Sequence, residues 1–455
     1  MYRTCCLLVA AATAVALYTA PAQAQQAPSL LPLPQVHTNS FSSTQTSVHP
    51  ISYFEKGKKD KKKADKPMDM PPPVAVEQDP PSVYEQAMSS NWGGDCASCL
   101  PSACADYGYW FGGVYGLYMT RDHSNDLVIS CDDAATNVLI STQDADMGWE
   151  GGTEVRFGRT FCGGQYAWEA VYWGIYPDGD GSEANVFWTD PRVTNQLGTH
   201  LSLDNLDRGD ALGSVDTLVV GAERHKIRRD YEFHNVEINL LNLGTCGCYA
   251  PCGGCNMGCD AGCGGCCAPR YNLSTFAGVR FMKLDESFQF ASDAVDTSFG
   301  TDLANENYYD VETQNFLIGV QLGSRGDLRW TDRFSTFGAI NLGLYGNHMR
   351  QEQRVYNGLG QVATVNNGYY DGAAYDIVET KNDVAFLGEA RLGVSYQLSN
   401  CWQLTAGYRA VALTGVALAT EQIPVNFHDL DEARRINSNG SMILHGAFFG
   451  AEAKF

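Results

Sequence analysis

From residue 109 onward, hydrophobic and polar residues alternate over long segments of the chain, and the last segment shows this most clearly. Ile443, Phe449 and Phe455 fall on one face of an extended chain, while glycines and charged residues occupy the other. His445 is a polar exception on the apolar face. Side chains of a β-strand point alternately to its two faces, so each such segment predicts a strand with one apolar and one polar face.

Ten segments follow this pattern. They span about residues 108–121, 148–161, 165–177, 229–244, 271–285, 311–325, 333–349, 384–398, 402–416 and 441–455. Apart from the fourth connection, long and short connections alternate between them, as external loops and periplasmic turns do in outer-membrane barrels. A hairpin hidden within 178–228 or 350–383 would raise the count to twelve.

A soluble β-sandwich also alternates, but three features favour a membrane barrel. The expected strands have about 13–16 residues, far more than an ordinary strand. Aromatic residues near the strand ends are typical of interfacial girdles; they are Tyr109, Trp149, Tyr166, Trp168 and Trp402. Phe449 and the terminal Phe455 resemble the signal by which the barrel-assembly machinery recognises outer-membrane proteins. We therefore predict an all-β fold, an antiparallel transmembrane β-barrel over 108–455.

The first hundred residues predict export and a low-complexity arm. Residues 1–24 have a basic start at Arg3, an apolar stretch and a small-residue cleavage site, as a secretory signal peptide does. Residues 25–107 are rich in Pro and Lys, including the run 56–63, and cannot bury enough apolar surface to fold alone. This periplasmic arm is either a solvated linker or a segment that binds anionic cell wall or lipid.

The fourth connection, 245–270, is a cysteine-rich insert on the predicted periplasmic side. Its eight cysteines are Cys246, Cys248, Cys252, Cys255, Cys259, Cys263, Cys266 and Cys267. In an oxidising compartment they predict a disulfide-stapled plug or cap. The alternative is a zinc or iron–sulfur site, because two Cys-x-x-Cys pairs have ligand spacing.

Composition and charge narrow the function. The chain has 455 residues and a formal charge of −21, which argues against a nucleic-acid partner. The chain contains no apolar run of about 18 residues, so a bundle of membrane helices is excluded. The five long external loops hold 30 acidic and 10 basic residues. Within them, Asp178, Asp180 and Glu183 have carboxylate spacing suited to calcium, without the other ligands of a complete motif.

Nine charged residues are expected to point into the barrel. They are Glu150, Glu154, Arg156, Glu169, Glu237, Arg280, Glu389, Arg391 and Arg409. In a wet lumen they would form a constriction that sets ion preference, and in a closed barrel they would form a packed ion-pair core. His225, His234 and His348 fall near external strand ends, but no catalytic or cofactor motif accompanies them, so we expect neither an enzyme nor a cofactor.

Four segments of the expected strands resemble the β-barrel porins that planctomycetes encode in many copies. They are Trp110–Tyr115, Gly148–Gly152, Phe276–Phe281 and Glu389–Gly393, and the resemblance covers about 105–455. It implies an outer-membrane location, reached after signal-peptide cleavage, and passive solute passage. It carries over no substrate, cofactor or catalytic residue.

The sequence thus predicts a porin-like channel for passive passage of small hydrophilic solutes, with outer-membrane lipid, small solutes or ions as partners. The alternative is a closed structural or adhesive barrel that presents its acidic external loops.

Overall fold

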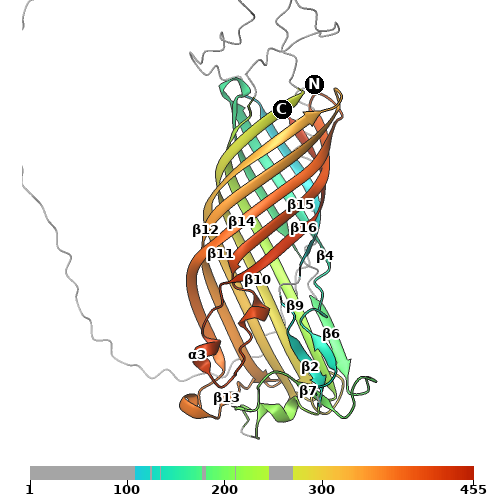
Figure 1. The fold of residues 1–455 in the computed structure, drawn as a ribbon, viewed down its shortest axis with the longest axis vertical. Helices are drawn as coiled ribbons and strands as arrows, with labels where there is room; N and C mark the ends of the chain where they lie inside the picture. Colours follow the sequence, from blue (N-terminus) through green and yellow to red (C-terminus); the bar gives the residue numbers. More distant parts are fainter. Residues whose placement is uncertain (1–107, 123–124, 134, 177–180, 211, 245–269) are drawn as a thin grey trace, which may run out of the picture. The chain divides into compact units, whose positions relative to one another are not determined.

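A computed structural model describes residues 108–455 except 123–124, 134, 177–180, 211 and 245–269 (Figure 1). Within these ranges no helix is long and apolar enough to cross a membrane. The expected signal peptide, the arm, all eight cysteines of the insert, Asp178 and Asp180 lie outside the described residues.

Ten antiparallel strands form one closed barrel, as the alternation predicts (Figure 1). They are β1 (Trp110–Arg121), β4 (Trp149–Phe161), β5 (Tyr166–Ile175), β9 (Arg224–Asn242), β10 (Tyr271–Asp293), β11 (Glu306–Arg329), β12 (Phe334–Asn357), β14 (Asp376–Gln397), β15 (Trp402–Val416) and β16 (Gly440–Lys454). Each pairs with the next, β16 returns to β1, and β9 pairs with both β5 and β10. The wall therefore has no open edge.

The outer surface divides into an apolar band and a polar extension. On β10 the outward residues from Tyr271 to Phe281 are exposed and mostly apolar, and the next two outward residues are Lys283 and Asp285. In register with Phe281 stand two further apolar outward residues, Val236 on β9 and Ile318 on β11, so the apolar surface continues onto the neighbouring strands. Ten residue steps at a tilt of about 40° correspond to a height of about 25 Å, which matches the apolar band of outer-membrane barrels.

Several strands continue well beyond this band, so the strands expected from the sequence are too short. The strands β10, β11, β12 and β14 have 23, 24, 24 and 22 residues, where about 15 to 17 were expected for each. In the extension the polarity is reversed. Phe288 and Phe290 point inward and are buried, whereas Ser287 and Gln289 point outward. The expected strands were bounded by the assumption that apolar residues face lipid. They therefore end where the outward residues become polar, although the strand itself continues.

The connections lie as the alternation of lengths predicts. At one end of the barrel are short turns, including η2 (Cys162–Gly164), the turn 330–333 and the turn 398–401 that contains Cys401. The long connections gather at the other end, which by the usual rule for bacterial barrels is the cell exterior (Figure 1).

The long loops fold into a cap whose apolar core contains Ile129, Leu139 and Phe427 and continues into inward-facing barrel residues such as Phe288 and Tyr309. Its elements are β2 (Val128–Asp132), β3 (Val138–Ser141), β6 (Ser182–Phe187), β7 (Leu197–Thr199), β8 (Leu206–Asp207), η3 (Val215–Leu218), β13 (Thr364–Val365), η4 (Gly368–Tyr370), η5 (Ala419–Gln422) and α3 (Leu430–Ala433). The strands within 178–228 and 350–383 stay outside the barrel wall, except that β6 pairs with the outer part of β9. The described wall therefore keeps ten strands rather than twelve.

Candidate functional site: the barrel interior

The charged residues expected inside the barrel do face the interior, and eight of them meet in one layer. We call this the ion-pair layer; it consists of Glu154, Arg156, Glu169, Glu237, Arg280, Glu389, Arg391 and Arg409. Glu150 lies on the same face of β4 as Glu154, two inward positions nearer the cap.

Arg280 and Arg409 are the two centres of the ion-pair layer. Arg280 Nη2 lies 2.6 Å from Glu237 Oε1 and 2.7 Å from Glu389 Oε2. Arg409 pairs with Glu154, and its Nε lies 3.2 Å from Glu389 Oε1. Two of these contacts, Arg280–Glu389 and Arg409–Glu154, join strands that are not neighbours, because β11 and β12 separate β10 from β14, and β16 and β1 separate β15 from β4. The side chains therefore reach across the lumen.

Glu389 also compensates a repulsion between two arginines that stand opposite each other on neighbouring strands. Arg391 on β14 stands directly opposite Arg409 on β15, and like charges so placed destabilise a sheet. Glu389 Oε1 lies 3.3 Å from Arg391 Nε and 3.2 Å from Arg409 Nε, so one carboxylate compensates both cations.

Neutral polar side chains complete the layer on the remaining strands. Gln321 on β11 donates to Glu237 at 2.7 Å, and Asn341 on β12 donates to Glu389 at 3.3 Å. The Arg156 guanidinium, paired with Glu154 and 3.5 Å from Glu169, lies 5.6 Å from the ring centroid of Tyr115 on β1. Tyr115 donates in turn to Glu452 on β16. All ten strands thus contribute to one network.

Burial shows that this network fills the lumen rather than lining a water path. Glu154, Glu169, Glu237, Arg280, Glu389 and Arg409 are between 0% and 8% exposed. Four glutamates balance four arginines in the layer, as buried ionic groups require, because an unpaired buried charge is strongly destabilising. The arrangement matches the packed-core interpretation of these residues.

An apolar layer covers the ion-pair layer on its outer side. Trp173, Phe233, Leu284 and Leu444 point inward and are at most 1% exposed. The Arg409 guanidinium lies 4.9 Å from the ring centroid of Trp173, which places the two layers in contact. The sequence analysis named only charged residues as candidates for the lumen and did not anticipate this layer.

A second buried charge cluster lies above the apolar layer and was also missed. Glu286 Oε1 lies 3.1 Å from Arg229 Nη2, and Glu286 Oε2 lies 3.3 Å from Arg121 Nη2. The backbone N–H of Ala419 also donates to Glu286. Glu286 was assigned to an external loop, so nothing in the sequence linked it to an arginine on another strand.

The segment 417–438 closes the outer end of the lumen from within. Asn315 and Ala417 exchange two hydrogen bonds of 2.8 Å, and the side chain of Gln353 donates to the carbonyl of Gln422 at 2.8 Å. Phe427 is fully buried, with its ring centroid 4.9 Å from that of Tyr309. Barrel side chains therefore hold this loop through its backbone.

The remaining candidate residues lie apart from the lumen. Fully buried His225 donates from Nε2 to the Val219 carbonyl at 2.9 Å, and its Nδ1 lies 2.7 Å from Ser130 Oγ. Burial lowers the pKa of His225 to about 4. His234 and His348 lie on the outer surface of the barrel. These three histidines do not converge on a common site.

The external acidic residues are partly structural. Glu183 lies 3.5 Å from Lys226, and the described residues contain no group of three His, Cys, Asp or Glu side chains arranged to hold a metal. Asp132 is buried in the cap and accepts hydrogen bonds from Thr136, Asn137 and Thr194, which hold its pKa well below the usual range.

Comparison with known protein families assigns the chain to one of them. A family described as "Putative beta barrel porin-7" matches residues 226–455, half of the sequence, and the matched part runs from β9 to β16. The chain belongs to this family. Membership in a barrel-porin family agrees with the resemblance seen in the sequence and indicates an outer-membrane location.

Solved structures similar to this porin-family chain are also β-barrels. The outer membrane protease OmpT from Escherichia coli matches with 9% identity over 78% of this chain and 98% of that chain, at a TM-score of 0.36. A Pseudomonas aeruginosa FadL homologue matches with 7% identity over 81% and 95%, at 0.22, and the P. putida toluene transporter TodX with 8% over 77% and 90%, at 0.19. At these values the likeness says nothing about what the chain does. No curated protein matches it significantly.

Proposed function

We propose that this porin-family protein is a barrel with a lumen closed in its resting state, which holds an acidic cap at the cell surface. The observation that carries the proposal is the ion-pair layer, in which charged side chains from six strands, six of the eight residues buried, meet across the lumen. Polar side chains of the other four strands join them. The apolar layer and the inward segment 417–438 block the same path further out.

The cap is then the part that meets the surroundings. The segments expected as external loops, which form the cap and the outer parts of the strands, hold 30 acidic and 10 basic residues. Apart from buried Glu286 and others that pair within the barrel, these carboxylates could concentrate cations or bridge surface glycans through divalent ions. Asp132 serves the fold of the cap, so only the more exposed carboxylates are available for this role.

The second candidate function is passive passage of small hydrophilic solutes, which membership of the porin family favours. It requires that the ion-pair layer and the segment 417–438 both rearrange. Transport would then be gated rather than permanently open, because the ion-pair residues are buried and barrel side chains hold the segment 417–438 by hydrogen bonds.

Conductance across a planar bilayer tests the proposal. The full mature protein, shown to be folded by its shifted mobility on unheated gels, should give no steady conductance, while a general porin in the same preparation does. Steady conductance from the folded protein in salt solution would reject the closed barrel and establish the channel.

A further inference from the structure

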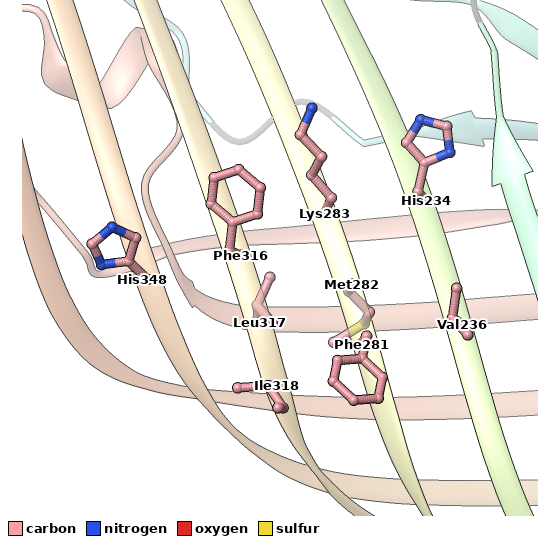
Figure 2. Close-up of a pocket in the computed structure, with 9 residues that line it drawn as sticks. All are labelled: His234, Val236, Phe281, Met282, Lys283, Phe316, Leu317, Ile318 and His348. Carbon is pink, nitrogen blue, oxygen red and sulfur yellow. The ribbon is translucent and has the colours of Figure 1, made fainter.

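A groove of about 380 Å³ lies on the outer surface of the barrel across β9, β10, β11 and β12 (Figure 2). It sits where the apolar band gives way to the polar extension. Towards the membrane it is bounded by Val236, Phe281 and Ile318, and towards the cell exterior by His234, Lys283 and His348. The groove thus joins an apolar floor to a rim of basic side chains.

A missing side chain adds space beside His348. Gly346 is the outward residue next to His348 on β12 and stands opposite Ile318. A Cβ built there would meet only the Ile318 carbonyl oxygen, at 3.9 Å. Any larger residue at this position would project over the floor.

The charges above the floor are ordered. His234 pairs with Glu232 at 2.8 Å, Lys283 with Asp285, and Arg350 with Glu352. In each pair the basic residue is the one nearer the apolar band, because β9 runs towards the periplasm whereas β10 and β12 run away from it. The ammonium of Lys283 and the guanidinium of Arg350 therefore lie on the side of the lipid headgroups.

Lys283 keeps binding capacity in spite of its pairing. An ammonium group has three donors, and its ion pair with Asp285 occupies one side of it. The side chain is 37% exposed and extends beside the ring of Phe316, with Nζ 5.8 Å from the ring centroid. Figure 2 shows Lys283 between Phe316 and His234.

We propose that this groove binds an anionic phospholipid of the outer leaflet. Its phosphate would accept a hydrogen bond from Lys283, and one acyl chain would lie along Phe281 and Ile318; His348, whose Nδ1 bonds Asn382 Oδ1 at 2.7 Å, bounds the groove without donating to the phosphate. Basic groups near a membrane surface attract anionic headgroups, and the apolar floor offers exposed surface that an acyl chain covers. The site is on the outside of the barrel, so it is independent of whether the lumen is open or closed.

Native mass spectrometry of the full mature protein in detergent tests this site with phosphatidylglycerol and, as the zwitterionic comparison, phosphatidylcholine. Wild type should retain phosphatidylglycerol more tightly. Lys283→Gln should weaken phosphatidylglycerol binding about fivefold, the effect of one surface cation, and leave phosphatidylcholine unchanged. The matched control is Lys226→Gln, which removes a lysine paired with Glu183 at 3.5 Å well above the band and should change neither.

Gly346→Leu tests the shape of the groove separately from its charge, and it should weaken both lipids by covering the floor. Equal affinity of wild type for the two lipids, or equal losses in the two lysine variants, would overturn the proposal. Displacement of the lipid by excess inorganic phosphate would show a free-anion site instead and would also overturn it. If Lys283→Gln does not reach the folded gel mobility, unchanged lipid binding by Gly346→Leu is the refuting result.

Discussion

Replacement of Arg280 by methionine should destabilise the barrel more than almost any other single polar substitution. Arg280 is fully buried and compensates two carboxylates, those of Glu237 and Glu389. Methionine fills much of the volume but leaves Glu237 without its cation, while Glu389 keeps Arg391 and Arg409. Breaking a buried ion pair by removing one partner costs about 3–5 kcal/mol, and we expect a loss in that range.

The double variant Glu237→Gln/Arg280→Met separates lost charge compensation from lost packing. The side-chain amide that replaces the Glu237 carboxylate would be neutral, and its oxygen could still accept from Gln321 and Asn239, which donate to Glu237 in the wild type. Because no uncompensated carboxylate is then buried, the double variant should recover about 2 kcal/mol or more relative to Arg280→Met alone.

The measurement is the free energy of unfolding in urea, followed by tryptophan fluorescence of the barrel in lipid vesicles. Arg354→Gln is the control, because Arg354 and Asp376 are exposed on the outer surface 4.0 Å apart and such a pair contributes less than about 1 kcal/mol. A loss below about 1 kcal/mol for Arg280→Met, or a double variant no more stable than the single one, would refute the argument that the layer is dry and tightly compensated.

Three further predictions concern the cap and the lipid face. Burial lowers the pKa of His225 to about 4, so below the unfolded value of about 6.5 the unfolded chain binds more protons than the folded one. The stability of the cap should therefore fall by about 3 kcal/mol as the pH drops from about 6.5 to 4, and the external loops should be cleaved faster by protease. A His225→Gln variant should lose this pH dependence. Phe427→Ala removes a fully buried ring packed on Tyr309 and should cost about 3–5 kcal/mol of cap stability; an unchanged proteolysis rate would contradict this. Val320 lies in the middle of the apolar band and is 61% exposed, so Val320→Arg should lower the free energy of unfolding in urea by about 2–4 kcal/mol. Glu312→Arg, on the same face of β11 above the band, should lower it by less than about 1 kcal/mol. Equal losses would mean that the band has been assigned to the wrong residues.

The sequence predicted the barrel well because its signal is local. Within the membrane, each strand carries its own alternation, and Ala385–Gln397 shows the same faces in the structure as in the sequence. Beyond the membrane the outer face of each strand meets water and the inner face meets the apolar core of the cap. Phe288 therefore faces inward, while side chains still alternate between the two faces. The period predicts a strand there, but the assumption that apolar residues face lipid does not hold.

The pairing inside the lumen was beyond sequence reasoning for a different reason. The alternation along each strand identifies which charged side chains face the lumen. Which of them contact one another depends on the barrel diameter and on the register of the strands. Arg409 and Glu154 meet across 255 positions of sequence, and Arg280 and Glu389 across 109. A neutral sum of charges fits both a wet constriction and a dry core, and only burial separates the two.

The energy that holds the ion-pair layer together bears directly on how conductance should appear. If separating Arg280 from its partners costs about 4 kcal/mol, as the pairing suggests, a state with this contact broken is populated about one part in a thousand. The apolar layer and the segment 417–438 must move as well before a water path exists, which lowers the population further. An intact barrel should therefore show rare, brief openings if it shows any. A variant that lacks only the Arg280 contact should open little more often, because the outer barriers remain in place.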